Sequence, residues 1–180
     1  MELRLVSAND SDKLLLDEIN SEAFPENERT ALDELYASGG AVPIDILGIY
    51  ENGVPAGYFA VRKWGRLRYM AYFAVRADLR CRGIGSRALG LLREYYPHSV
   101  IVLEFEAPDA SLSGNDVRLR RRAFYLRSGF CETGWYTFYD GVELELACSE
   151  QDFDAEAFMA FAAHLHLTFS DTVPKFYRKD

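Results

Sequence analysis

The chain has 180 residues, enough for one domain with a substantial hydrophobic core but too few for two large domains. Hydrophobic residues make up 49% of the sequence and charged residues 27%, which argues against a disordered or fibrous protein. The 20 basic and 28 acidic side chains give a net charge of −8, so we expect no nucleic-acid partner and a preference for cationic ligands.

Three cysteines cannot all pair within one chain, and their wide separation is typical of a protein from a reducing compartment. No apolar run approaches the roughly 20 residues needed to cross a bilayer, and residues 1–12 lack a signal pattern. We therefore expect a cytoplasmic protein with no membrane partner.

The N-terminal part predicts a strand at residues 3–6 and then two amphipathic helices that meet at Phe24-Pro25. A polar cluster at residues 9–12 suits the start of the first helix, and Gly39-Gly40 ends the second. The apolar residues expected on the buried helix faces are Leu15, Ile19, Ala23, Leu32, Leu35 and Tyr36.

An antiparallel meander should follow. Residues 44–50 and 57–62 are expected to pair across the Asn52-Gly53 turn, and residues 67–75 should add a third strand. The chain then changes to a strand, a glycine-bearing loop and a helix, so the next strand, at 100–105, should lie parallel to the one before it.

The remaining elements are a helix, a hairpin and a second helix. Gly129 should stop the first helix, and Asp140-Gly141 should form the hairpin turn. The expected ranges are a helix at 118–128, strands at 130–139 and 142–147, and a helix at 153–165 followed by a polar end.

The sharpest local signal is the segment Arg80-Cys81-Arg82-Gly83-Ile84-Gly85-Ser86, between a strand and a helix. Small residues let backbone amides approach an anion, and a helix expected to begin near Ser86 adds its positive dipole end. The segment is therefore a candidate phosphate site. A tight turn with solvated arginines is an equally good interpretation of the loop taken alone.

Dinucleotide binding is one context for this loop, because Gly83-x-Gly85-x-x-Ala88 fits the relaxed fingerprint and Glu104 follows about 20 residues later. The order of elements argues against it, since a dinucleotide-binding fold needs further strand–helix–strand units after the fingerprint. A P-loop is excluded because no Gly-Lys-Ser/Thr sequence follows.

Two motifs and the order of elements over residues 3 to about 147 make the chain resemble the GNAT superfamily of acetyl-coenzyme A dependent N-acyltransferases. The first motif is Arg80-Cys81-Arg82-Gly83-Ile84-Gly85, after a strand that ends in Val75. The second is Phe124-Tyr125-Leu126-Arg127-Ser128-Gly129-Phe130. One departure is Arg118 where the family often has Asn; the nearest Asn is Asn115, and its role stays open.

The resemblance implies a mixed α/β fold with a mostly antiparallel central sheet of about seven strands flanked by helices. It also implies a V-shaped opening between the fourth and fifth strands. We assign residues 1–148 to this acetyltransferase domain and residues 149–180 to a C-terminal helical extension.

The family binds its co-substrate acetyl-coenzyme A (acetyl-CoA) along a strand and on the loop after it. Carried over, the strand residues Phe73, Ala74 and Val75 would contact the pantetheine. The pyrophosphate would lie on the loop residues Arg80, Cys81, Arg82, Gly83, Ile84, Gly85 and Ser86.

Catalytic candidates come from the motif and from strand alternation. Tyr125 matches the family tyrosine that hydrogen-bonds or protonates the sulfur, although a core tyrosine is the alternative. Glu104 and Glu106 alternate onto one face of their strand, where a carboxylate could bind a protonated amine or accept its proton. A strand end that emerges into solvent explains these acids equally well, and Glu104 is our choice because it should lie deeper.

The acids Glu26 and Glu28 lie between the first two helices, the region that in this family closes over the acceptor, so they are candidate amine-binding residues. The chain is thus expected to be an N-acetyltransferase for a small-molecule or peptide amine. A non-catalytic acyl-CoA binding module is the alternative, and a nucleotide-dependent oxidoreductase is a distant third. We expect no metal, because His164 and His166 lack accompanying ligands. Homodimer formation stays open.

Overall fold

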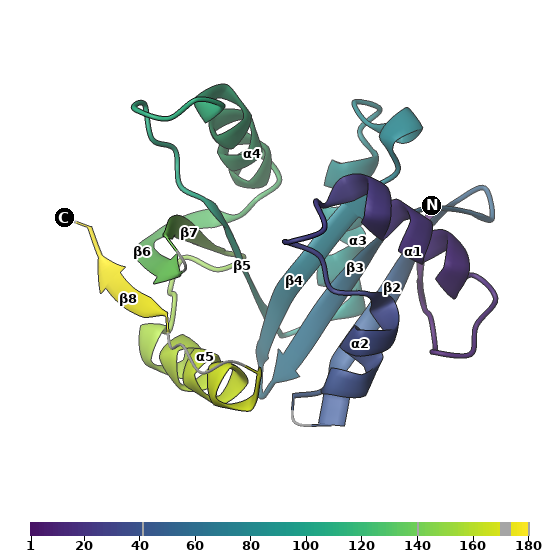
Figure 1. Ribbon diagram of the computed structural model, residues 1–180, viewed down its shortest axis with the longest axis horizontal. Coiled ribbons are helices and arrows are strands. Elements are labelled where there is room, and N and C mark those ends of the chain that lie inside the picture. The colour runs from purple at the N-terminus through teal and green to yellow at the C-terminus, as the bar shows by residue number, and fades with distance from the viewer. Residues whose placement is uncertain (41, 140, 170–173, 180) are drawn as a thin grey trace. The chain divides into compact units, whose positions relative to one another are not determined.

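The computed structural model describes residues 1–40, 42–139, 141–169 and 174–179. The chain divides into two compact units, residues 1–99 and residues 100–180. In Figure 1 the first unit runs from purple to teal and the second from green to yellow.

Four antiparallel strands follow one another in the first unit, each paired with the next. Asn52 and Gly53 have φ angles of 53° and 79°, so they form the two-residue turn that the sequence predicts. The strands are β1 (Glu2–Leu5), β2 (Ile44–Glu51), β3 (Val54–Trp64) and β4 (Leu67–Val75).

Helices cover both faces of these strands. In Figure 1, α1 and α2 lie on one face and α3 on the other. Their bounds are α1 (Lys13–Ala23), α2 (Leu32–Ala37) and α3 (Ile84–Tyr95), with short 3-10 segments at Ser38–Gly40 and Ala77–Leu79. The core under α1 and α2 contains Val6, Leu16, Ile19, Leu32, Leu35, Ile46, Tyr58, Ala60 and Ala74.

The buried face of α1 differs from the predicted one at its first position. Leu15 is 45% exposed, whereas Leu16 is fully buried, and Asn20 is only 1% exposed. Asn20 reaches the core because both ends of its side-chain amide are hydrogen-bonded, which removes the usual cost of burying an amide. The predicted position of Leu15 is therefore wrong.

The second unit also contains four strands among its described residues, in the order β5, β7, β6, β8. All the pairs within this unit are antiparallel. The strands are β5 (Val100–Glu106), β6 (Cys131–Tyr139), β7 (Val142–Cys148) and β8 (Lys175–Arg178). Strand β8 pairs with β6 where the sequence predicted only a polar end.

Two helices belong to the second unit. Helix α4 (Asn115–Arg127) begins three residues before the predicted start, and Gly129 follows its end with a φ of 84°, as predicted. Helix α5 (Ala155–Phe169) buries Phe158 against Phe176 of β8, with ring centroids 5.8 Å apart. Of the predicted Asp140-Gly141 turn, Asp140 lies outside the described residues.

The predicted mixed α/β fold with a mostly antiparallel arrangement of strands is confirmed, with eight strands among the described residues instead of about seven. The opening between the fourth and fifth strands stays a prediction, as does the division at residue 148.

Candidate functional site

The predicted phosphate loop leaves the end of β4 and is anchored there by arginines. The Arg76 amide donates to the Ala56 carbonyl at 2.9 Å, and its guanidinium group pairs with Asp78 at 2.7 Å. Arg80 Nε donates to the Val75 carbonyl at 3.0 Å. Residues 80–83 are exposed to solvent. The loop is thus held at its base while its tip is accessible.

Gly83 sets the geometry at the tip of the loop. Its φ of 76° and ψ of 1° place it in the left-handed region directly before α3, which begins at Ile84 and not near Ser86 as predicted. The first amides of a helix have no acceptor within the helix, and the dipole makes this end positive. A Cβ added at Gly83 would meet no atom within 4 Å, so the loop is open to a ligand. These features fit a phosphate group.

The backbone groups at the end of β4 point alternately toward β3 and away from it. The Arg76 amide and the Ala74 carbonyl both point toward β3, as their closeness to Ala56 and Gly57 shows. Because backbone groups alternate along a strand, those of Phe73 and Val75 point away from β3. The Phe73 ring stacks on Phe59 with centroids 4.5 Å apart. The Val75 carbonyl, which points away from β3, is the acceptor of the Arg80 side chain described above.

Gly57 supports this arrangement, and the sequence analysis missed its role. A Cβ at Gly57 would lie 2.3 Å from the Ala74 carbonyl oxygen, so only glycine lets β3 pack so closely against β4. Further along, the register shifts between Ala60 and Val61, which leaves Ala71 of β4 as an extra residue. Bulges of this kind re-aim neighbouring side chains and occur often beside active sites. A glycine as the first residue of a predicted strand was the available signal.

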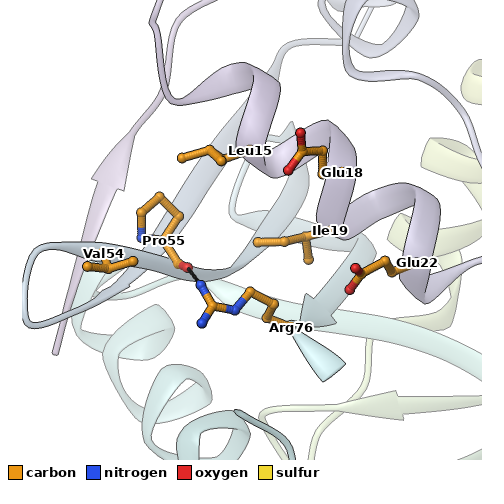
Figure 2. A pocket seen from close by; sticks show the side chains of 7 residues that line it. All are labelled: Leu15, Glu18, Ile19, Glu22, Val54, Pro55 and Arg76. Atoms are coloured by element: carbon orange, nitrogen blue, oxygen red, sulfur yellow. Dashed lines mark hydrogen bonds between the residues drawn. The ribbon is translucent and has the colours of Figure 1, made fainter. Parts of the chain in front are cut away.

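A small hollow of about 150 Å³ lies beside the base of the loop (Figure 2). Arg76 contacts the Pro55 carbonyl there at 3.3 Å, and Glu18 and Glu22 of α1 stand on the opposite side. Its other lining residues are Leu15, Ile19 and Val54. None of the residues predicted to bind acetyl-CoA or the amine lines this hollow.

In the second unit, the end of α4 fixes Tyr125. The Phe130 amide donates to the Tyr125 carbonyl and the Gly129 amide to the Leu126 carbonyl, both at 3.1 Å, which is a Schellman motif. The Tyr125 ring contacts Phe130 edge-on at 6.0 Å and stacks on Phe105 of β5 at 5.5 Å. The second family motif is thus a helix stop that orients one tyrosine.

Burial raises the pKa of Tyr125 to about 12, and the nearby charge of Arg121 lowers it slightly. The phenol therefore keeps its proton at neutral pH and can donate a hydrogen bond.

The two strand acids share one face of the sheet, as predicted, but Tyr125 packs on the other face. Glu104 and Glu106 pair with Leu146 and Leu144 of β7. Phe105, whose ring stacks on that of Tyr125, pairs with Glu145. Directly paired residues point to the same side. The structure therefore does not bring Glu104 and Tyr125 together on one face.

Each of the two acids accepts a hydrogen bond from a neighbouring side chain. Glu106 Oε2 accepts a hydrogen bond from Arg118 Nε at 2.5 Å, which compensates its negative charge. Glu104 accepts a hydrogen bond from the neutral hydroxyl of Thr137, a residue that is 3% exposed. Glu104 was predicted to lie deeper than Glu106, but both side chains are partly exposed, so the difference in burial is small.

Other polar groups on α4 were not predicted as site residues. Arg122 Nε donates to both carboxylate oxygens of Glu145, at 3.1 Å and 3.0 Å, and Glu145 is only 3% exposed. Asn115 Oδ1 and Arg118 Nη1 are buried and have no hydrogen-bond partner among the described residues.

Glu26 and Glu28 are exposed and lie on the connection between α1 and α2. No group of three or more His, Cys, Asp or Glu residues that could hold a metal ion occurs within residues 1–40, 42–139, 141–169 and 174–179. In the same ranges no helix has the length and apolarity needed to cross a membrane.

Known proteins with solved structures are similar to this chain. A GNAT-family acetyltransferase of Bacteroides thetaiotaomicron is 25% identical, with a TM-score of 0.74, and the match covers 92% of this chain and 96% of that one. A GNAT-family acetyltransferase from Elizabethkingia anophelis with acetyl-CoA bound is 14% identical, with a TM-score of 0.57 and coverage of 82% and 96%.

The aminoglycoside 6′-N-acetyltransferase from Enterococcus faecium is 14% identical, with a TM-score of 0.62 and coverage of 86% and 99%. A comparison with curated protein sequences gives no significant match. The profile of the acetyltransferase (GNAT) family matches residues 13–130. That match spans more than half of the chain and includes the loop after β4 and the tyrosine motif of α4, so the chain belongs to the GNAT acetyltransferase family.

Proposed function

We propose that this protein is an N-acetyltransferase that moves an acetyl group from acetyl-CoA to a primary amine of a small cationic acceptor, by direct attack in a ternary complex. The observation that carries the proposal is the exposed loop of residues 80–83, which ends in left-handed Gly83 at the start of α3. In this position, first-turn amides and a positive dipole end converge on open space. We assign residues 80–86 to the pyrophosphate.

We assign the pantetheine to the β4 backbone at Phe73–Val75. A ligand that lies along a strand edge hydrogen-bonds like an additional strand. Gly57 holds β3 against the other side of this segment, so the segment is rigid where the ligand would bind. The solved GNAT-family structure from Elizabethkingia anophelis contains acetyl-CoA, which supports this choice of co-substrate.

Acetyl-CoA supplies an activated thioester. The amine must lose a proton to attack, and the C–S bond breaks as the C–N bond forms. Three tasks therefore fall to the protein: to bind the amine while solvent water takes its proton, to position the carbonyl and to stabilise the departing sulfur, which water then protonates. We assign the third task to Tyr125. With a pKa of about 12, its phenol is a much weaker acid than a thiol, whose ordinary pKa is about 8.5. Tyr125 therefore stabilises the thiolate by donating a hydrogen bond, without transferring its proton completely.

We assign amine binding to Glu104 in preference to Glu106. Arg118 forms an ion pair with Glu106 and competes with an amine for that carboxylate, and the Glu104 carboxylate is partly exposed and accepts a hydrogen bond from Thr137. Glu26 and Glu28 extend the acidic surroundings of the acceptor, and the Enterococcus faecium neighbour is named for a cationic acceptor class.

The test is the release of free thiol from acetyl-CoA in the presence of a panel of amines that includes polyamines, aminoglycosides, amino acids and peptide N-termini. We expect one cationic class to accelerate release, with equal amounts of thiol and acetylated amine. Tight binding of acetyl-CoA without amine-dependent release would instead support a non-catalytic acyl-CoA binding module. Calorimetric titration with NAD, for which we expect no heat of binding, separates both from an oxidoreductase.

A further inference from the structure

The connection between α1 and α2, residues 24–31, is fixed by side chains from neighbouring elements. This connection carries Glu26 and Glu28, both exposed. Within it, the amides of Glu28 and Arg29 donate to the Pro25 carbonyl at 3.0 Å and 3.1 Å, which forms a tight turn. The acids are therefore displayed on an ordered turn, and the way in which that turn is attached decides where their charges lie.

Asn20 of α1 makes the buried attachment. Its Nδ2 donates to the Thr30 carbonyl at 3.0 Å, and its Oδ1 accepts a hydrogen bond from the Tyr58 hydroxyl at 2.8 Å. The side chain is 1% exposed, so the loss of either bond would leave a buried polar group unpaired. Asn20 thereby joins the end of the connection to β3.

Tyr72 of β4 makes the second attachment. Its hydroxyl donates to the Glu28 carbonyl at 3.2 Å and is hydrogen-bonded to Thr30 Oγ1 at 3.0 Å. Its ring meets Phe24 edge-on, with centroids 5.2 Å apart. Tyr72 directly precedes Phe73, the first residue assigned to the pantetheine. One strand thus holds the acidic connection with a side chain and offers its backbone to the co-substrate.

We propose that Tyr72 is a positioning residue for the acceptor amine, which ties the connection bearing Glu26 and Glu28 to the strand that binds acetyl-CoA. The inference rests on the proposed function. Because Tyr72 and Phe73 are consecutive, the bond to Glu28 fixes the acidic turn relative to the co-substrate. Without the hydroxyl, the turn can move while the strand stays in place.

The decisive variant is Tyr72→Phe, which retains the ring contact with Phe24 and removes both hydroxyl hydrogen bonds. We expect KM for the amine to rise about five- to tenfold, with kcat and the Kd for acetyl-CoA within about twofold of wild type. The matched control is Tyr36→Phe, which removes the hydroxyl bond to the Val6 carbonyl at 2.7 Å, away from the connection. That variant should retain the wild-type KM.

Hydrogen exchange gives a readout that does not need activity. The Glu28 and Arg29 amides should exchange faster in Tyr72→Phe than in the wild type, and at the wild-type rate in Tyr36→Phe. Faster exchange with an unchanged KM for the amine, or an equal rise of KM in both variants, would overturn the role of Tyr72. If the wild-type protein acetylated no amine, the proposed function itself would be refuted. If the wild-type protein were active and Tyr72→Phe had the same KM for the amine, only the role of Tyr72 would be refuted.

Discussion

Gly83 and Gly114 have the same local conformation in two different surroundings. Each precedes a helix, with φ of 76° and 82°, and a Cβ at either position would enter open space. Only Gly83 lies in the proposed phosphate loop. A side chain at either position would have the same left-handed backbone, but only one at Gly83 would meet the phosphate. The two glycines therefore form a matched pair for mutation.

We predict that Gly83→Asn weakens acetyl-CoA binding by more than about tenfold, or about 1.4 kcal/mol. Asparagine tolerates the left-handed region, so the fold should persist while the new side chain occupies the space outside the loop. Gly114→Asn should leave the affinity unchanged, and calorimetric titration measures both. Equal losses in the two variants would show that strain, and not phosphate contact, decides the effect.

Tyr125→Phe tests the role of the phenol in stabilising the sulfur. We predict a fall in kcat of about ten- to a hundredfold with an unchanged Kd for acetyl-CoA, since the ring packing on Phe105 survives. Because the pKa of Tyr125 is about 12, the ratio of wild-type to variant kcat should stay constant from neutral pH to about pH 10. A variant with full kcat in single-turnover measurements would make Tyr125 a structural residue.

Glu104→Gln should lower kcat/KM for the amine about tenfold or more and leave acetyl-CoA binding intact, because it removes the charge and keeps the acceptor for Thr137. Glu106→Gln is the comparison, and a small effect is expected, since Arg118 already compensates that charge. Initial rates over a range of amine concentrations distinguish the two. A larger loss in Glu106→Gln would move amine binding to Glu106.

At the scale of single elements, the ion pair between Arg122 and Glu145 secures α4 on β7. The Glu145 side chain is 4% exposed and that of Arg122 is 30% exposed, and Arg122 also pairs with the half-exposed Glu132. Removal of the Glu145 charge therefore leaves Arg122 in partly dry surroundings with one carboxylate partner. We predict that Glu145→Gln lowers the free energy of unfolding by about 2 kcal/mol, less than the roughly 3–5 kcal/mol typical of fully buried pairs.

Urea unfolding of three variants checks this prediction. The double variant Arg122→Met/Glu145→Leu should lose less stability than Glu145→Gln, because the carboxylate whose ion pair it breaks, that of Glu132, is half exposed and stays solvated. Glu2→Gln, which breaks the exposed pair with Arg4, should leave the urea midpoint unchanged. If Glu145→Gln behaved like Glu2→Gln, the pair would not hold the helix.

The sequence predicts an element well where its own residues determine its geometry. The Asn52-Gly53 turn and the Gly129 helix stop both depend on local left-handed backbone, so both could be predicted. The buried face of α1 could not, because Asn20 is buried only by virtue of partners on β3 and beyond α1. Likewise β8 is a strand because β6 pairs with it, which its four residues do not reveal.

The same distinction applies to the candidate site. Strand alternation correctly places Glu104 and Glu106 on one face, but the position of Tyr125 on the other face depends on the register of β5 with β7. The role of Gly57 depends on a contact with Ala74, which only the paired strands define. The motifs thus locate the loop and the tyrosine, whereas tertiary packing sets their orientation.

At the scale of the whole molecule, buried tyrosines predict the response of the fold to alkali. Burial raises the pKa of Tyr36 and of Tyr125 to about 12, and it also raises the pKa values of Tyr50, Tyr58 and Tyr96. A pKa raised above the ordinary value of 10.0 contributes stability that is fully present below pH 10 and is lost as the pH rises toward 12.

We therefore expect the free energy of unfolding to fall steeply between about pH 10 and pH 12, with tyrosinate absorbance appearing together with the loss of helical circular dichroism. Tyrosines that ionised fully before any loss of helical signal would contradict the predicted burial effect.

Transfer of an isotopically labelled acetyl group from acetyl-CoA to an amine tests the central claim most directly. Product masses are measured for the wild-type protein, for Gly83→Asn and for Tyr125→Phe, with the best amine of the panel. We predict label on the amine nitrogen in amounts equal to the thiol released, a higher acetyl-CoA requirement in Gly83→Asn and a lower rate at saturation in Tyr125→Phe. Acetyl-CoA binding by the wild-type protein without any labelled amine would contradict the assignment as an N-acetyltransferase.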